Sequence, residues 1–238
     1  MRNVVLTPEK AVVINKTAII ADLHLGIENV MQNKGVAIPR MQISDVILQT
    51  RKIIEKYKIK KLVIAGDLKH EFSKNLPYEW EDVRTFIESI DVDLSVVRGN
   101  HDNFLAAILA EYNITLKEYE KVGEYYVVHG HKDVEFEKII MGHEHPAIKI
   151  RVRGGIYNYP CYLLADDSKI VLPAFSPLMS GSDVLQTEFL SPILKKANKI
   201  EVYAIEDEVF YLGRLEDLKK IVGYLLYQSF SKIFLHLS

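Results

Sequence analysis

Five short apolar segments of this sequence lead directly into side chains that bind metal ions. The segments are residues 18–21, 62–65, 96–97, 126–128 and 139–141. Seven side chains that follow them are candidate metal ligands: Asp22, His24, Asp67, Asn100, His129, His143 and His145. Oxygen and nitrogen donors without a thiolate suit Mn, Fe, Zn, Co or Ni better than Ca or Mg. Seven ligands are too many for one open zinc site, but they fit two divalent ions that share a carboxylate. Mn is the first choice for these ions.

The spacing of these residues predicts how they converge. Asp22 and His24 lie two residues apart, so their side chains point to the same side if the chain is extended. His143 and His145 repeat that spacing. Asp67 should follow a central strand, and carboxylate oxygens can bridge two metals. We therefore expect Asp67 to bridge the two metals.

Two metal ions roughly 3.5–4 Å apart suit displacement at phosphorus, because they lower the pKa of a bridging water to about 7 and neutralise phosphate oxygens. His101 follows Asn100 directly and is the candidate general acid, since imidazole titrates near neutral pH. Asp102 could hold the other ring nitrogen of His101 and fix its tautomer. These residues predict hydrolysis of a phosphate ester.

Each motif also has an ordinary structural interpretation. Asp-x-His is often a surface turn or a helix cap, and Gly66-Asp67 could be a simple turn. The segment 99–102 could form a β-turn with an Asx hydrogen bond, and His129 could be a buried structural histidine. The occurrence of all five motifs at successive strand ends favours the metal site.

The arrangement of predicted elements indicates an α/β protein. Strands and helices alternate in the first half, with helices expected over residues 40–56, 77–90 and 104–111. After residue 123, seven strands follow in quick succession, which suits antiparallel pairing or a second sheet. We expect two facing sheets with outer helices, in one domain over residues 1–238. A helix over 215–229 should close it, and residues 221–238 would form a helical tail that packs in the core or makes a homodimer.

Composition restricts the class of protein only weakly. The hydrophobic share is 48%, the charged share is 26% and the formal charge is −2, which are ordinary values for a soluble globular protein. The chain has no overall basic field for nucleic acid, although two bound cations would add positive charge. A single cysteine, Cys161, excludes an internal disulfide and fits a reducing compartment. With no signal peptide and no membrane span in the pattern, we expect a cytoplasmic location.

The ordered set of motifs resembles the calcineurin-like metallophosphoesterase superfamily, whose pattern is D-x-H, G-D, G-N-H-[DE], H and G-H-x-H. The resemblance implies a four-layer αββα sandwich of two facing mixed sheets flanked by helices, with two metals. It implies one metal at Asp22, His24 and His145, the other at Asn100, His129 and His143, and Asp67 between them. His101 would stand near the leaving group.

Within that superfamily, residues 20–26 and 66–70 look like the SbcD-type repair nucleases, and the chain looks closest to short archaeal phosphoesterases related to them. The resemblance makes His70 a candidate phosphodiester contact, although it could equally be a solvated turn residue. His131 and the loop at residues 173–182 could line the site or only pack. Those nucleases carry a further DNA-gripping domain, for which this chain has no room.

Three functions remain in competition. The first is a phosphodiesterase of nuclease type that acts on single-stranded or end-accessible nucleic acid, alone or with a DNA-gripping partner protein. The second is a small-molecule phosphoesterase for a cyclic nucleotide, a nucleotide conjugate or a phosphomonoester. The third is a non-catalytic scaffold, which the intact set of ligands disfavours.

Overall fold

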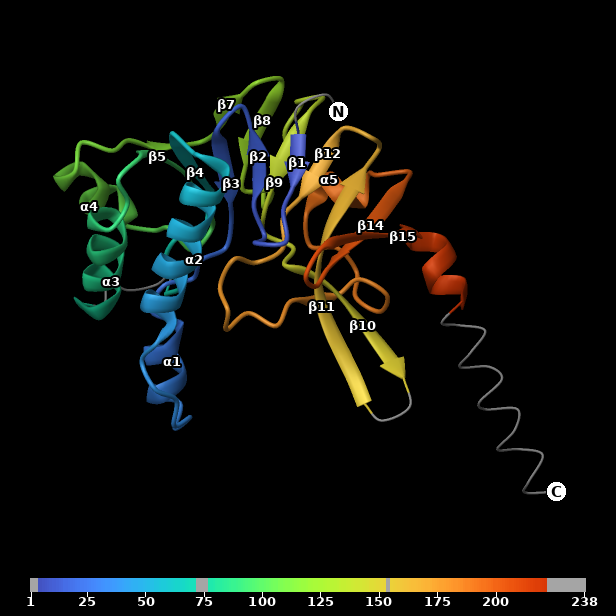
Figure 1. The fold of residues 1–238 in the computed structure, drawn as a ribbon, viewed down its shortest axis with the longest axis horizontal. Coiled ribbons are helices and arrows are strands. Elements are labelled where there is room, and N and C mark those ends of the chain that lie inside the picture. The colour runs from blue at the N-terminus through green and yellow to red at the C-terminus, as the bar shows by residue number, and fades with distance from the viewer. Residues whose placement is uncertain (1–3, 72–76, 153–154, 222–238) are drawn as a thin grey trace.

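The computed structural model describes residues 4–71, 77–152 and 155–221, and two β-sheets dominate it (Figure 1). The first sheet runs in chain order through β1 (Val4–Leu6), β2 (Val12–Ile14), β3 (Thr17–Ile20), β4 (Lys61–Ala65), β5 (Asp93–Val97) and β6 (Leu116–Lys117). β1, β2 and β3 are antiparallel, whereas β3, β4, β5 and β6 are parallel. The parallel strands therefore end at one edge of this sheet.

The second sheet is also mixed. In chain order its strands are β7 (Glu120–Val122), β8 (Tyr125–Val128), β9 (Ile139–Met141), β10 (Pro146–Val152), β11 (Gly155–Ala165), β12 (Lys169–Val171), β13 (Ser182–Asp183), β14 (Ile200–Ile205) and β15 (Val209–Arg214). β8, β9 and β12 are parallel neighbours, while β10, β11 and β14 pair antiparallel. Figure 1 shows the β10–β11 hairpin reaching away from the body of the protein.

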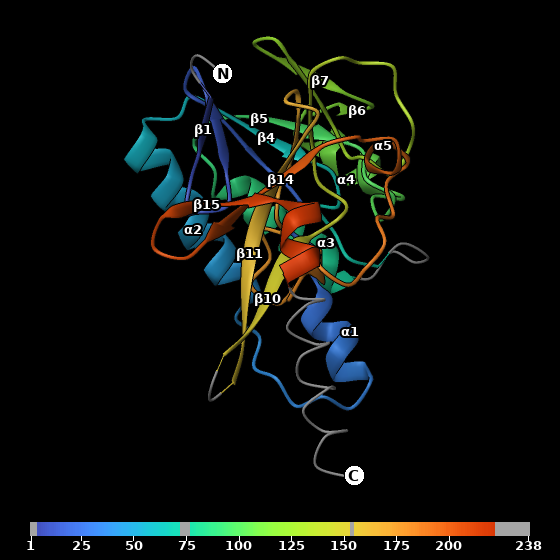
Figure 2. The same ribbon diagram turned by 90° about the vertical axis from the view of Figure 1, so that its right-hand side faces the viewer.

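Helices cover the outer faces. α2 (Gln42–Tyr57), α3 (Pro77–Glu88) and α4 (Leu105–Glu111) pack on the first sheet, and α1 (Ile27–Asn33) extends beyond them (Figure 2). α5 (Pro192–Lys195) and a helix at residues 215–221 lie on the side of the second sheet. The four-layer α/β sandwich predicted from the sequence is confirmed.

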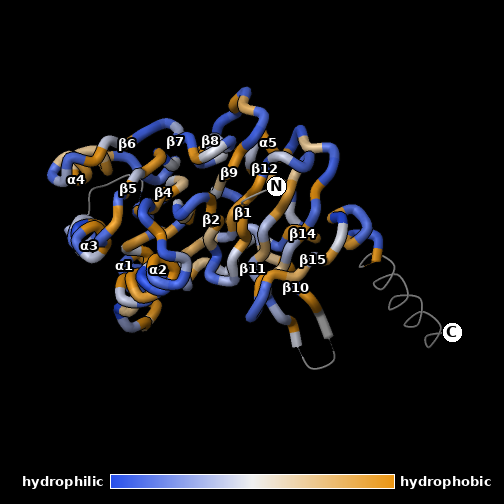
Figure 3. The backbone as a smooth tube through the Cα atoms, turned by 45° about the horizontal axis from the view of Figure 1, so that its top comes forward, coloured by the Kyte–Doolittle hydropathy of each residue, from blue (hydrophilic) through white to orange (hydrophobic). Residues whose placement is uncertain are grey.

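Alternation along the strands produces the layers, because successive side chains of a strand point to opposite faces. Ile20 and Leu62 pack toward the helices, while their neighbours Ile19 and Val63 pack between the sheets. Tyr162 of β11 is fully buried between the sheets, and its hydroxyl donates to the carbonyl oxygen of Thr7 at 2.7 Å. Hydrophobic residues are accordingly concentrated in the strands (Figure 3).

The predicted helices at 40–56, 77–90 and 104–111 are confirmed with small shifts at their ends, but α1 was missed. Its sequence begins at Gly26 in a left-handed conformation, with no side-chain cap to announce a helix. The predicted closing helix begins at residue 215 as expected, and residues 222–238 of the predicted tail lie outside the described residues. In the part of the chain that the structure describes, no helix is long and apolar enough to cross a membrane.

Candidate metal centre

The candidate ligands follow the carboxyl ends of parallel strands in both sheets, where ligands gather in such folds. Asp22 follows β3, Asp67 follows β4 and Asn100 follows β5; His129 follows β8 and His143 follows β9. Backbone hydrogen bonds hold the loops after β3 and β4 side by side. The amide of Asp22 donates to the carbonyl oxygen of Gly66 at 3.1 Å, and the amide of His24 donates to that of Asp67 at 3.0 Å. The fold therefore brings five distant motifs to one place.

The backbone at the site is not extended. Positive φ angles occur at five candidate ligands: Asp22 at 60°, His24 at 47°, Asp67 at 52°, His143 at 73° and His145 at 46°. The prediction that Asp-x-His and His-x-His converge through an extended chain is therefore wrong. Left-handed turns aim these side chains instead. Such conformations are uncommon outside glycine and cluster at functional sites.

One group of ligands joins the two sheets. Nε2 of His24 lies 3.2 Å from Nε2 of His145, which in turn lies 3.2 Å from Oδ1 of Asp22. Asp22 is fully buried, and its two carboxylate oxygens accept the backbone amide of His143 at 3.2 and 3.0 Å. Donor atoms of Asp22, His24 and His145 thus converge closely enough to hold one metal ion.

A second group surrounds His129. Its Nδ1 donates to the Ala65 carbonyl oxygen at 3.0 Å, which leaves the Nε2 lone pair facing Oδ1 of Asn100 at 3.0 Å and Oδ2 of Asp67 at 3.3 Å. Asp22, Asp67 and His129 form another cluster that could hold a metal ion. The His143 ring lies beside the His129 ring, with centroids 5.0 Å apart.

Asp67 stands between the two groups. Its Oδ2 is 3.3 Å from Nε2 of His129 and 3.8 Å from Nε2 of His24, while its Oδ1 accepts the backbone amide of His101 at 2.9 Å. Gly99 permits this approach, since a Cβ there would lie 2.1 Å from Oδ1 of Asp67. One carboxylate is therefore within reach of imidazoles from both groups.

The donor atoms fit divalent cations. Lone pairs of Asp67, Asn100 and His129 point at one another, an arrangement that a cation satisfies and that is otherwise repulsive unless a proton fills it. Burial lowers the pKa of His129, but the hydrogen bond and charge of Asp67 outweigh burial and raise the pKa to about 9. Burial lowers the pKa of His24 to about 3, so its ring is neutral and able to donate to a metal.

The structure corrects the expectation for Asp102. Nδ1 of His101 lies against the backbone carbonyl oxygen of His70, in the place that the sequence analysis gave to Asp102. The fully buried Asp102 carboxylate instead accepts the backbone amides of Gly99 and Asp67 at 2.8 Å each and of Leu68 at 2.9 Å. Burial, reinforced by the charge of Asp67, raises the pKa of Asp102 to about 6. Asp102 therefore ties two loops of the site together.

His70 and the 173–182 loop lie against the centre. Nδ1 of His70 is 3.3 Å from Nδ1 of His24, and the His70 ring stacks on that of His101 with centroids 5.6 Å apart. The backbone amides of Phe175 and Ser176 donate to the carbonyl oxygens of Ala21 and Asp22 at 2.8 and 3.2 Å. The loop thus packs directly behind the first motif.

Gln42, at the start of α2, is a supporting residue that the sequence analysis missed. Its buried amide nitrogen donates to the carbonyl oxygens of Leu23 and His24 at 3.0 Å each and to the Ser176 hydroxyl at 2.9 Å. It therefore joins the first motif to the 173–182 loop. Nothing in the local sequence distinguishes it, because its partners lie 18 to 134 residues away.

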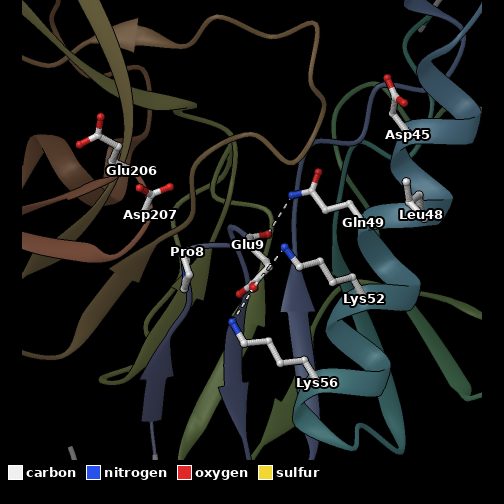
Figure 4. Close-up of a pocket in the computed structure, with 9 residues that line it drawn as sticks. All are labelled: Pro8, Glu9, Asp45, Leu48, Gln49, Lys52, Lys56, Glu206 and Asp207. Atoms are coloured by element: carbon white, nitrogen blue, oxygen red, sulfur yellow. Dashed lines mark hydrogen bonds and ion pairs between the residues drawn. The ribbon is translucent and has the colours of Figure 1, made fainter.

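A different hollow lies between α2 and the β14–β15 turn and contains none of the candidate ligands (Figure 4). There the buried Glu9 carboxylate accepts from Nζ of Lys56 at 2.7 Å and from the hydroxyl of Tyr57 at 2.8 Å. Lys52 lies 3.9 Å from the same carboxylate. We call these four residues the Glu9 cluster, and its carboxylate is fully matched by the protein's own donors.

The model of the calcineurin-like phosphoesterase family matches residues 16–203, which include every candidate ligand. The chain belongs to this family. Membership indicates a metal-dependent phosphoesterase, and the clusters described above fit the divalent metals that such enzymes use.

A solved structure supports the fold of this calcineurin-like phosphoesterase. The Pseudomonas putida nuclease MPE is similar with a TM-score of 0.65 and 20% identity, over 88% of this chain and 94% of that one. The E. coli phosphoesterase YfcE is 15% identical over 83% of this chain and 97% of that one, with a TM-score of 0.41. A likeness with so low a TM-score supports no conclusion about this chain. Among curated protein sequences, none matches this chain.

Proposed function

We propose that this phosphoesterase is a phosphodiesterase of nuclease type, acting on single-stranded or end-accessible nucleic acid. The observation that carries the proposal is the position of Asp67 between two ligand groups, within 3.3 Å of His129 and 3.8 Å of His24. Two metals with a shared carboxylate suit displacement of an alkoxide from phosphorus. The likeness to a nuclease over 94% of that chain supports the choice of substrate.

Asp22, His24 and His145 would hold one divalent ion, and Asn100, His129 and His143 the other, with Asp67 in contact with both. Bound there, the ions would supply Lewis acidity and lower the pKa of water toward about 7. We propose Mn as the ion that gives the highest activity, with Fe, Zn, Co and Ni as alternatives, because the donors are nitrogen and oxygen. Metal content and activity after reconstitution with each ion would rank them.

His101 would protonate the leaving oxygen. Its Nδ1 contacts the His70 carbonyl oxygen, so this nitrogen is the one held as N–H, and the proton to be transferred sits at Nε2. Nε2 lies 4.0 Å from Oδ2 of Asp67, and the side chain is 26% exposed, so a substrate can reach it. His70 stacks on the same ring and would help to orient it and the phosphodiester.

The test compares two substrates whose leaving groups differ in basicity. Mn-loaded wild type should hydrolyse both bis-p-nitrophenyl phosphate and labelled single-stranded DNA. His101→Ala should slow DNA cleavage by about 10²–10⁴-fold and the p-nitrophenyl ester much less, because only the DNA leaving group needs a proton. Equal losses on both substrates would contradict the role of His101, and Glu124→Gln, at an exposed ion pair, is the control.

A small-molecule phosphoesterase is the second candidate, favoured by the formal charge of −2, which offers no general attraction for a polyanion. Turnover of the p-nitrophenyl ester without cleavage of DNA would favour this candidate or a separate DNA-gripping subunit. No turnover of either substrate, despite two bound metals, would favour the non-catalytic scaffold.

A further inference from the structure

A small cavity adjoins the metal centre at His129. It has a volume of about 280 Å³, and its lining includes His129, His131, Tyr119 and Phe136. His129 belongs to the second ligand group, so this side chain is a wall common to the cavity and the centre. The cavity therefore lies next to the place where a phosphate would bind at the metals.

The position of the cavity follows from the topology. Tyr119 lies on the short link between β6, at the edge of the first sheet, and β7, at the edge of the second. His131 and Phe136 lie on the connection between β8 and β9. The cavity thus lies between two loops, one of which begins at the candidate ligand His129.

Aromatic rings line one side. The Tyr126 and Phe136 rings stack with centroids 4.0 Å apart, and the Tyr119 ring packs edge-on against Phe136 at 5.3 Å. Tyr119 is nevertheless 50% exposed, although it rests on two other rings. A supported aromatic ring open to solvent is a platform on which a planar ligand can stack.

The polar groups select an uncharged ligand. Nδ1 of His131 is buried and has no hydrogen-bond partner among the described residues, whereas buried polar atoms are normally paired. Arg98 and Lys132 also line the cavity, but three carboxylates, those of Glu118, Asp133 and Glu135, line it too, and Glu118 lies 3.1 and 3.5 Å from the two cations. The cavity therefore offers stacking without net attraction for a second phosphate.

We propose that this cavity binds one nucleobase of the substrate, next to the phosphate that is cleaved. The inference rests on the proposed phosphodiesterase function and adds that a nucleoside is recognised on one side of the bond. A volume of 280 Å³ is at the lower end for ligand pockets, which suits one base rather than a length of strand.

The experiment measures binding without turnover. Calorimetry with the metal-loaded protein compares adenosine 5′-monophosphate with ribose 5-phosphate, which differ only in the base. Wild type should bind the nucleotide about tenfold more tightly, because its base can stack on an aromatic side chain. Tyr119→Ala should remove this preference and leave the affinity for ribose 5-phosphate unchanged.

Two variants control the result. Tyr119→Phe keeps the ring and should keep the preference, and Tyr211→Ala removes a comparably exposed tyrosine of β15 and should change nothing. Equal binding of both compounds by wild type, no binding of either, or a preference that survives Tyr119→Ala would each overturn the nucleobase site. Turnover of bis-p-nitrophenyl phosphate, which lacks a base, reports separately on the proposed phosphodiesterase function.

Discussion

Two clusters in this protein contain buried carboxylates, and the negative charges of the two clusters are compensated in different ways. In the Glu9 cluster, one carboxylate accepts from Lys56 and Tyr57 at ordinary hydrogen-bond distances. In the metal centre, Asp22 and Asp67 are buried among imidazoles and an amide oxygen that themselves carry lone pairs. The first cluster is complete as it folds. The second leaves lone pairs facing one another for a cation or a proton to fill, and this difference separates a structural charge from a cluster suited to metal binding.

The backbone of the metal centre is also unusual. Candidate ligands such as Asp22, Asp67 and His143 have positive φ angles, and Gly99 and Gly142 lie against the two carboxylates. Strained conformations are maintained where the surrounding structure compensates for them. The predictions below test whether metal binding is the property that distinguishes the two clusters.

The largest effect should come from Asp67→Asn. An amide cannot replace a charged bridge between two ligand groups, so we expect a loss of activity greater than the roughly 10–100-fold that follows loss of a supporting partner. Metal stoichiometry, measured by elemental analysis, should fall below two ions per chain. Full occupancy in this variant would contradict the bridging position.

Removal of the metals should destabilise the wild type strongly. A cation at 100 times its dissociation constant stabilises the folded state by about 2.7 kcal/mol. Thermal unfolding with Mn and with a chelator should differ accordingly, and Glu9→Gln should show the same difference as wild type. A chelator that shifts the Glu9 variant less would mean that the two clusters are coupled.

Gly142→Ala should damage the centre without touching a ligand. Its Cβ would lie 2.5 Å from Oδ2 of Asp22 and 2.6 Å from Cβ of Ala21, so the carboxylate must move. We expect metal affinity to fall by about 10–100-fold. Gly155→Ala is the matched control, since the atom nearest its Cβ is 3.8 Å away in the Tyr157 ring. Unchanged affinity in both variants would show that Asp22 tolerates displacement.

The smallest effect should come from Glu9→Gln, about 1 kcal/mol of stability at pH 7, because Lys52 and Lys56 are largely exposed to solvent. Burial raises the pKa of Glu9, but hydrogen bonds from Lys56 and Tyr57 outweigh it and lower the pKa below its usual 4.5. The contribution is therefore complete above pH 4.5 and fades as the pH falls further. Urea unfolding at pH 7 and pH 3.5 should show the variant approaching wild type at the lower pH.

The sequence identified more of the site than of the backbone that forms it. Side-chain chemistry and motif order pointed to Asp22, Asp67 and His129, because the residue types that bind metals are visible in the sequence, and the fold brings these three together. Sequence periodicity could not reveal the left-handed turns at these residues, since positive φ leaves no pattern in neighbouring side chains. The partner of His101 was missed for a related reason: it is a backbone carbonyl, which every residue possesses.

The amino-acid sequence by itself determined the layered α/β class, the strand ends that carry the site, and the donor atoms available to a metal. It did so because strand alternation and ligand chemistry are local properties. Only the tertiary structure decided that Asp102 joins two loops and that Tyr119 and His131 share a cavity. Those relations depend on contacts between residues far apart in the chain, which no local pattern encodes.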